Sequence, residues 1–332
     1  MSTPVTQIVM VGPRGVGKTS LLAAMYSELE KELDKINCNF FTEQGPTTAR
    51  IGKQLRDLKS VASSSGAKIQ AGEGIDAGQQ EEIYTFHLDV GDGGEPEVTL
   101  EFIDLPGGWY TGTGDYKRAD EVLGRAHVSF LAVDATALME VPLKDAPRLG
   151  KYHDIINFPF DIRQAYRRVK FADGHVVILT LIRAETYVHS GRIHQLIEKT
   201  QKAYAELAGD LGKKGIPLLG CYVETVGSLT FNAFTEEDGK VSSHFMRNPQ
   251  IGYRPARCAV PLRIAAGKAL SAALDDALIQ LIREDTFWGK ILELFGLNEA
   301  LRRAREKHHR VYAAFDKLGK SIVEADYFEI KP

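Results

Sequence analysis

The sequence predicts an α/β fold in which helices cover both faces of a mostly parallel sheet. Continuous apolar runs such as residues 126–135 (AHVSFLAVDA) and 174–182 (GHVVILTLI) are typical of strands buried on both faces. Helical stretches separate these runs, and an alternation of strand and helix favours parallel strands. The composition agrees with a globular protein, since 44% of the 332 residues are hydrophobic and 26% are charged.

The elements are predicted from local patterns. We expect strands at 6–12, 82–90, 97–105, 126–135, 174–182 and 216–225, and helices at 18–34, 48–62, 152–168 and 191–208. The second and third strands flank the turn GDGGEP and are predicted to form an antiparallel hairpin. Residues 63–80 are rich in Ser, Gly and Ala and are predicted to form a mobile loop. Residues 1–235 are predicted as the main domain, and 236–332 as its remainder with a C-terminal helical extension.

Composition and charge exclude several classes of protein. The net charge of −3 gives no global basic field, so nucleic-acid binding is not expected. Cys38, Cys221 and Cys258 are widely spaced and odd in number, which favours free thiols and a cytoplasmic location over a disulfide framework. The start MSTPVTQIVMVG lacks the basic and apolar regions of a signal peptide. Asp134 and Arg183 interrupt the longest apolar runs, so no membrane span is expected.

The stretch GPRGVGKT carries the clearest motif, a G-x-x-x-x-G-K-T pattern between a predicted strand and a predicted helix. Backbone N–H groups of such a loop surround phosphate groups, and the positive end of the following helix adds to the attraction. The predicted phosphate-binding residues are Gly12, Pro13, Arg14, Gly15, Val16, Gly17, Lys18, Thr19 and Ser20. Lys18 would reach the β- and γ-phosphates, and Thr19 would place its hydroxyl on Mg²⁺. The alternative is a chance match in a Gly-rich turn.

A second motif, DLPG, follows the strand predicted at 97–105. Asp104 ends this strand, where a carboxylate can hold Mg²⁺ through water. Gly107 could donate its N–H to a γ-phosphate. A D-x-x-G pattern is weak alone, but here it follows Thr19 by 85 residues on a strand predicted to lie nearby. The alternative is a strand that ends in an ordinary turn.

These motifs and their order resemble the P-loop GTPases of the translation-factor and Ras-like class. The resemblance rests on GPRGVGKT, on DLPGG after a hairpin and on a strand ending in VDA, and it spans roughly residues 5–230. Within that class the layout is most similar to the bacterial double-GTPase type. The resemblance implies a three-layer P-loop fold, binding of GTP or GDP with Mg²⁺, and action in multi-gene conflict or defence systems.

In this class a strand ends in N/T-K-x-D, and the Asp carboxylate accepts two hydrogen bonds from guanine. The matching strand here ends in Ile182, Arg183 and, two residues on, Glu185. Glu185 supplies a carboxylate at the position of the Asp, and adenine lacks the pair of donors that this carboxylate would bind. The flat guanidinium of Arg183 could cover the face of the base. Ile182 cannot make the usual hydrogen bond back to the phosphate loop. Thr225 and Val226 match the next base-contact loop loosely. Adenine, no base preference, or a plain surface Arg and Glu remain alternatives.

The residues expected to promote hydrolysis depart from the pattern. The resemblance places a water-orienting Gln after D-x-x-G, but the residue here is Gly108. No Thr occurs between Thr48 and Thr85 to ligate Mg²⁺ from the first switch. Gln79 stands roughly where that Thr is expected and could contact the γ-phosphate or the water. The alternative is that Gln79 is a solvated loop residue.

Arg14 occupies a loop position that usually prefers small residues. A guanidinium beside the γ-phosphate could stabilise transferring charge as a built-in arginine finger. It could instead fill the space that a partner's finger needs, or it could point to solvent. Lys18, Arg14 and Gln79 are therefore the candidate catalytic residues.

Two regions are candidates for binding another protein. In the loop 106–118, Trp109 and Tyr110 follow the γ-phosphate motif and could face a partner, or they could pack beneath the loop. The C-terminal segment 297–318 has apolar residues at helical spacing, which fits a helix packed on its own domain or a partner-binding helix.

The sequence is compatible with two functions. The first is a switch with slow Mg²⁺-dependent GTP hydrolysis, whose nucleotide state controls an effector or a second GTPase. The second is a pseudo-GTPase that holds nucleotide as a scaffold. Gly108 favours the second function, and the intact Lys18, Thr19 and Asp104 favour the first.

Overall fold

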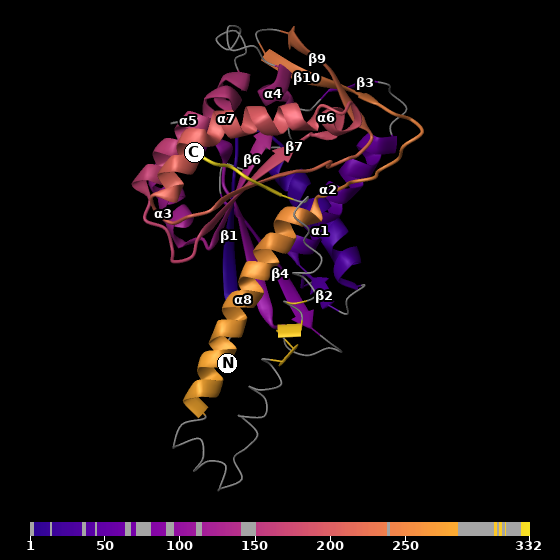
Figure 1. Ribbon diagram of the computed structural model, residues 1–332. Helices are drawn as coiled ribbons and strands as arrows, with labels where there is room; N and C mark the ends of the chain where they lie inside the picture. Colours follow the sequence, from indigo (N-terminus) through magenta and orange to yellow (C-terminus); the bar gives the residue numbers. More distant parts are fainter. Residues whose placement is uncertain are drawn as a thin grey trace.

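The computed structural model of the protein describes a large part of the chain and forms an α/β fold of three layers (Figure 1). The described residues are 3–13, 15–34, 38–43, 45–63, 68–70, 81–90, 96–110, 115–140, 151–237, 240–284, 309–310, 312–313, 316 and 327–332. The fold class predicted from the sequence is confirmed.

In the described part of the chain, eight strands form the main sheet in the order β11-β8-β7-β6-β1-β5-β4-β2. Their bounds are β1 Val5–Val11, β2 Cys38–Phe41, β4 Glu82–Val90, β5 Val98–Asp104, β6 Val128–Asp134, β7 Val176–Ile182, β8 Leu218–Tyr222 and β11 Phe328–Glu329. The five strands β5, β1, β6, β7 and β8 are parallel, and β4 pairs antiparallel with β5 as predicted. The antiparallel edge strands β2 and β11 were not predicted.

Helices cover both faces of this sheet. Their bounds are α1 Lys18–Asp34, α2 Pro46–Ser63, α3 Tyr116–Arg125, α4 Ala135–Glu140, α5 Lys151–Arg168, α6 Glu185–His189, α7 Ile193–Gly212 and α8 Ala259–Glu284, with a short 3₁₀ turn η1 at Gly107–Trp109. Helices α1, α2 and α8 lie on one side of the sheet, and α3, α5 and α7 on the other (Figure 1).

The alternating residues of β1 divide between two cores. Ile8 and Met10 pack with the side chains of α1 and α8, whereas Val9 and Val11 pack with those of α3 and α7. A strand sends successive side chains to opposite faces, so one apolar strand supplies both cores. Because all four residues are fully buried, β1 is fixed at the centre of the sheet and holds the loop that follows it.

A second, smaller sheet was not predicted. It has the order β3-β10-β9, with β3 at Lys68–Gln70, β9 at Leu229–Glu237 and β10 at Lys240–Arg247. Strand β3 lies within 63–80, so the prediction that this whole segment is a loop was wrong for these three residues. The domain boundary predicted at residue 235 stays a prediction; it would divide β9.

Helix α8 begins the predicted C-terminal helical extension. Its first half packs against α1 and contributes Val260, Leu262 and Ala265 to the core. The helix predicted within 297–318 lies mostly outside the described residues. Among the described helices, none is both long and apolar enough to cross a membrane.

The three cysteines, Cys38, Cys221 and Cys258, are free and buried. Burial raises the pKa of the Cys258 thiol well above its ordinary value, and nearby carboxylates add to the shift. This thiol is therefore held in its neutral form.

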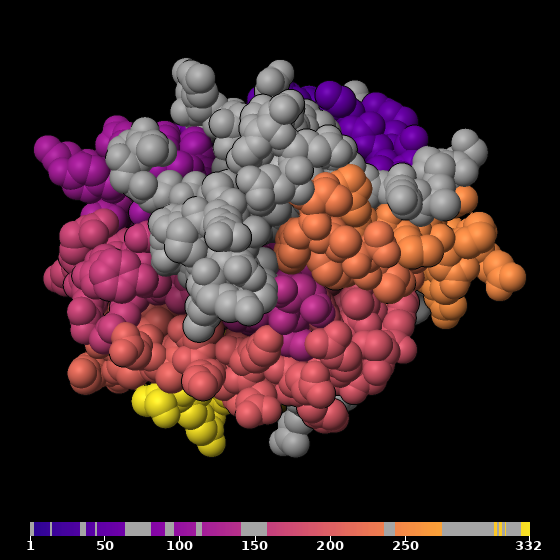
Figure 2. Space-filling model, turned by 90° about the horizontal axis from the view of Figure 1, so that it is seen from above, coloured from indigo at the N-terminus to yellow at the C-terminus, as the bar shows by residue number. Residues whose placement is uncertain are grey.

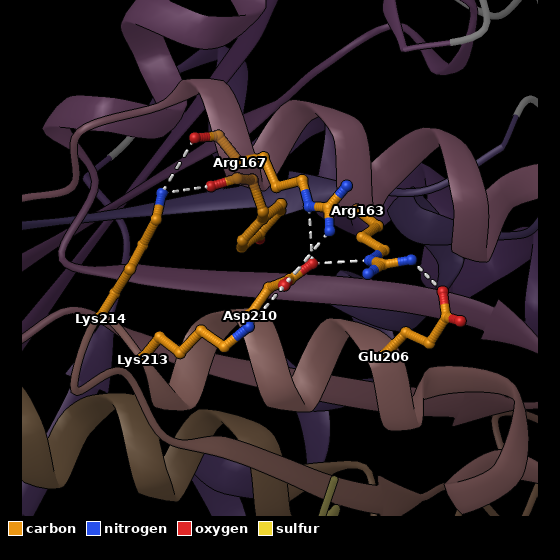
Figure 3. A network of polar contacts seen from close by, with 7 residues as sticks. Arg163, Arg167, Glu206, Asp210, Lys213 and Lys214 are labelled. Atoms are coloured by element: carbon orange, nitrogen blue, oxygen red, sulfur yellow. Dashed lines mark hydrogen bonds and ion pairs between the residues drawn. The ribbon is translucent and has the colours of Figure 1, made fainter.

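A polar network joins α5 to α7 on the outer surface (Figure 3). Asp210 of α7 accepts hydrogen bonds from Arg163 Nε at 2.6 Å and from Arg167 Nε at 2.8 Å. Lys214 Nζ donates to carbonyl oxygens at the end of α5, including that of Tyr166 at 2.7 Å. The carbonyls of a last helical turn lack partners within the helix, so Lys214 caps α5. The network joins two helices that pack on the same face of the sheet.

The buried His175 predicts a pH-dependent stability. Its Nδ1 lies 2.7 Å from the Ala126 carbonyl oxygen and its Nε2 lies 2.8 Å from Ser129 Oγ, an arrangement that suits the neutral ring. Burial lowers the pKa of His175 to about 4. A histidine in an unfolded chain titrates near 6.5, so the unfolded state binds the proton first as pH falls. We expect the free energy of unfolding to be about 2 kcal/mol lower at pH 5 than at pH 7 from this group.

Urea unfolding at the two pH values measures this effect, with His175→Asn as the comparison. The difference in stability between the parent and this variant should shrink as pH falls. A difference that stays constant with pH would show that His175 does not titrate in this range.

Candidate nucleotide-binding site

The loop between β1 and α1 has the backbone of a phosphate-binding turn. Gly15 and Gly17 have φ angles of +74° and +107°, which favour glycine. At Gly12, an added Cβ would lie 3.0 Å from the Ala132 Cβ and backbone oxygen, so the loop is pressed against β6. Helix α1 begins at Lys18, which places its positive N-terminal end at the carboxyl edge of the sheet.

Lys18, Thr19 and Asp104 come together at this edge. Lys18 Nζ donates to the Gly12 carbonyl oxygen at 3.2 Å and lies 3.6 Å from Asp104 Oδ1. Thr19 Oγ1 donates to Asp104 Oδ2 at 3.0 Å. Strands β1 and β5 are parallel neighbours, with Met10 paired to Asp104. This register explains how residues 85 positions apart meet.

The residues at this point fit a magnesium ion. Asp104 Oδ1 is buried and accepts no hydrogen bond, and the Thr19 hydroxyl lies beside the same carboxylate. Mg²⁺ prefers such oxygen ligands and usually keeps waters and phosphate oxygens as its other ligands. No group of three or more His, Cys, Asp or Glu side chains that could hold a metal occurs among the described residues.

The protonation of Asp104 follows from its surroundings. Burial raises the pKa of its carboxyl above the ordinary value, while the Lys18 charge and the Thr19 hydroxyl act in the opposite direction. A second cation beside the carboxylate would favour the charged form further.

The segment after Asp104 is packed rather than open. Gly107 is buried at the start of η1, and Trp109 N donates to the Pro106 carbonyl oxygen at 3.0 Å. Tyr110 is buried, and Trp109 packs partly against the same core. Of the two alternatives for Tyr110, the structure shows the packed one, because its ring lies in the core with the buried residues of α3. The role predicted for Gly107 stays a prediction.

Arg183, at the end of β7, reaches across to the phosphate loop. Its guanidinium donates to the Gly15 carbonyl oxygen at 3.2 Å and to Asp134 Oδ2 at 2.5 Å. It also lies over the Phe245 ring, 5.7 Å from the centroid. The link to the phosphate loop that Ile182 cannot make is supplied by the next residue, Arg183. The buried Ile182 instead packs in the core.

Glu185 and the loop after β8 also meet, as the sequence predicts. Glu185 Oε1 accepts hydrogen bonds from the Val226 N–H at 3.1 Å and from the Gly227 N–H at 3.3 Å. Burial raises the pKa of this carboxyl, whereas these N–H groups lower it. An added Cβ at Gly227 would lie 1.7 Å from the Arg254 carbonyl oxygen, so only glycine fits there. Thr225 is buried next to Val226.

The role of Asp134 is not apparent from the sequence. This fully buried carboxylate ends β6, accepts from the Thr136 N–H at 2.8 Å and binds Arg183. The VDA pattern at a strand end marked its position, but its partner lies 49 residues away.

An ion pair between Glu81 and Arg118 was also missed. Arg118 donates from Nε at 3.0 Å and from its terminal nitrogen at 2.6 Å to the two oxygens of Glu81. The Arg118 guanidinium holds the pKa of Glu81 below its ordinary value. Glu81 directly precedes β4 and Arg118 lies in the first turn of α3, so the pair joins the end of the loop before β4 to the end of the 106–118 loop.

The second sheet lies at the same edge as Arg183 and Glu185. The Phe231 N–H of β9 donates to Thr186 Oγ1 of α6 at 2.6 Å, and Phe245 of β10 contacts Arg183. In the view onto this face, the β9–β10 hairpin (orange) lies beside the red and rose surface that includes α6 and α7 (Figure 2).

Arg14 and Gln79 lie outside the described residues, so their predicted roles stay predictions.

A Gly-rich turn after a central strand, followed by Lys18 and Thr19 at a helix start and faced by Asp104, defines a P-loop nucleotide-binding site. The family model described as Double-GTPase 2 matches residues 7–210, and the chain belongs to this family. The family and the site together identify a GTP-binding protein.

Solved structures similar to this chain include several GTPases. The Ski7 GTPase-like domain of S. cerevisiae, bound to GDP and inorganic phosphate, is 13% identical with a TM-score of 0.36, over 66% of this chain and 43% of that one. Sup35 with GMPPNP is 11% identical with a TM-score of 0.33, over 68% and 38%. The G domain of the T. maritima FeoB iron transporter is 16% identical with a TM-score of 0.28, over 67% and 89%.

The chain thus spans less than half the length of the matched Ski7 and Sup35 chains. No protein in the curated collection matches it.

Proposed function

We propose that the protein is a GTP-binding switch that hydrolyses GTP slowly with Mg²⁺ and whose nucleotide state controls a partner. The observation that carries this proposal is the meeting of Lys18, Thr19 and Asp104 at the N-terminus of α1. In this arrangement a cation, a hydroxyl and a carboxylate face the place where a triphosphate and its metal would bind.

Each residue has a distinct role in this proposal. Lys18 binds the β- and γ-phosphates, and its charge stabilises them. Thr19 and Asp104 hold Mg²⁺, which supplies positive charge to the phosphate oxygens. Gly107 offers its N–H to the γ-phosphate. Arg14 is proposed, from its place in the sequence of the loop alone, to stabilise the charge that develops during transfer.

We propose guanine as the base. Glu185 lies three residues after the end of β7 and next to Thr225 and Val226. Its carboxylate can accept both donors of guanine, whereas adenine has no such pair of donors. Its Oε1 already binds two backbone N–H groups, which hold the carboxylate in place. Competition binding between GTP and ATP tests whether Glu185 makes this selection.

Hydrolysis is predicted to be slow. Gly108 has no side chain to orient water, so we expect intrinsic turnover at or below roughly 10⁻⁴ to 10⁻² per second, as in unassisted switch GTPases. Single-turnover measurement with the purified protein and Mg²⁺ tests this rate, and Arg14→Ala is the informative variant. A fall in rate with unchanged GTP affinity would assign Arg14 a transition-state role.

Other outcomes of this experiment are equally clear. A partner-stimulated rise seen only in Arg14→Ala would mark Arg14 as a steric block, and no change would place it in solvent. Turnover of about one per second in the parent, far above unassisted GTPases, would contradict a slow switch. Gln79→Ala would then be the first variant to examine.

The coupling to a partner rests on the segments around the phosphate site. The Glu81–Arg118 pair joins the entry to β4 with α3, so a change near the γ-phosphate in either segment would reach the other. The partner is proposed to be an effector protein or a second GTPase that binds the 106–118 loop or the C-terminal helix. A cytoplasmic location and a role in bacterial defence are part of this proposal.

The second candidate is a pseudo-GTPase scaffold, which Gly108 favours. The two functions differ in one measurement. A scaffold would bind GTP and gain thermal stability but show no GDP product in a single-turnover reaction, whereas a slow GTPase converts the bound GTP completely over hours.

A further inference from the structure

Arg183 stands out among the candidate base-binding residues by its backbone. Its φ angle of +64° lies in the left-handed region, which residues other than glycine rarely adopt. Such strain persists only where surrounding contacts hold the residue in place, and it is common in ligand-binding sites. The contacts of Arg183 therefore merit a functional explanation.

The first of these contacts is a buried ion pair. Asp134 is fully buried, and its Oδ1 already accepts from the Thr136 N–H at 2.8 Å and from the Thr136 hydroxyl at 2.6 Å. Its Oδ2 accepts from Arg183. A buried carboxylate without a cation is strongly destabilising, so Asp134 holds the guanidinium firmly.

The second contact comes from the smaller sheet. Phe245 of β10 is 4% exposed, and its ring lies under the Arg183 guanidinium at 5.7 Å. Phe231 of β9 packs edge-on against Phe245 at 5.8 Å and fixes that ring. A flat guanidinium over an aromatic ring is a favourable cation–π arrangement that also sets the plane of the guanidinium.

The third contact ties this group to the phosphate loop. Arg183 donates to the Gly15 carbonyl oxygen at 3.2 Å, and its side chain keeps 18% of its surface exposed. The guanidinium thus contacts the phosphate loop and stays partly open to solvent, on a residue two positions before Glu185.

We propose that Asp134 and Phe245 are positioning residues that hold Arg183 as a flat platform for a purine base. The second sheet then sets the part of nucleotide affinity that depends on the base. This inference rests on the proposed function, and its test separates the two.

The test compares GTP with inorganic tripolyphosphate, which has the phosphates but no base. In Asp134→Asn, the amide oxygen can still accept from the Thr136 N–H, but the charge that holds Arg183 is lost. We expect GTP affinity to fall about tenfold in this variant and about threefold in Phe245→Leu. Tripolyphosphate affinity should not change, because it depends on the phosphate loop alone.

Phe234→Leu is the matched control. Phe234 lies in β9 and contacts Phe231 at 4.8 Å, so the same truncation is made in the same sheet. It should leave the affinity for GTP and for tripolyphosphate at parent values. Phe245→Tyr, which restores an aromatic ring, should recover GTP affinity.

Three results would overturn the inference. Equal loss of GTP and tripolyphosphate affinity in Asp134→Asn and Phe245→Leu would mean that these residues only maintain the fold. Unchanged GTP affinity in both variants, with a parent that binds GTP, would refute the platform alone. A parent that binds tripolyphosphate no more weakly than GTP would contradict the proposed function, and the inference with it.

Discussion

Replacing Lys18 with alanine is expected to weaken GTP binding by about 3 kcal/mol, or roughly a hundredfold in the dissociation constant. The substitution removes the only side-chain cation that the described residues place within an ion-pair distance of Asp104. It also leaves the Gly12 carbonyl oxygen without its bond from Lys18 Nζ. A triphosphate would then meet an uncompensated carboxylate in place of an ammonium group. Isothermal titration calorimetry with GTP and Mg²⁺ measures the change.

Lys31→Ala provides the matched control for this prediction. Lys31 is exposed in the last turns of the same helix, α1, so the substitution removes the same charge far from the phosphate loop. Its GTP affinity should equal that of the parent. Equal affinity for Lys18→Ala and the parent would refute the assignment of the phosphate site.

Glu185→Gln is expected to remove the preference for GTP over ATP. Glutamine keeps a carbonyl oxygen that can accept from the Val226 and Gly227 N–H groups, so the loop after β8 stays in place. It cannot accept both guanine donors as a carboxylate does, and we expect GTP affinity to fall by about tenfold to a hundredfold. ATP affinity should change little. Competition binding with the two nucleotides measures the ratio.

Glu185→Ala is the companion to this variant. It removes the acceptor for both buried N–H groups, so we expect a loss of stability of about 2 kcal/mol as well as the loss of base preference. A parent protein without any GTP preference would show that Glu185 does not select the base.

Local patterns in the sequence were enough to predict the central part of the fold. Helix α1 begins and ends at the residues predicted, and the β4–β5 hairpin forms as expected. These elements have strong periodicity and clear turn signals, because both faces of the sheet are buried. The meeting of Thr19 with Asp104 followed from two motifs, each of which fixes a residue at the end of a strand or the start of a helix.

The second sheet could not be predicted in this way. The sequence LTFNAFTEE of β9 mixes polar and apolar residues and contains no long apolar run, so it gives no clear strand signal. Its position depends on contacts such as Phe231 with Thr186, 45 residues apart. Strand β3 has only three residues, which is too short for any period to be visible.

The individual hydrogen bonds of Arg183 and Glu185 could not be predicted from the sequence. The carboxylate of Glu185 could be predicted, but its bonds to Val226 and Gly227 depend on the close approach of two loops. Asp134 gave no sign of an ionic partner, since buried pairs form between residues that only the fold brings together.

The most direct test of guanine binding at this site is a calorimetric titration of nucleotide-free protein with GTP and with ATP in the presence of Mg²⁺. We expect GTP to bind at least about tenfold more tightly than ATP, because only guanine offers two donors to the carboxylate of Glu185. Equal affinities, or tighter binding of ATP, would show that the site does not select guanine.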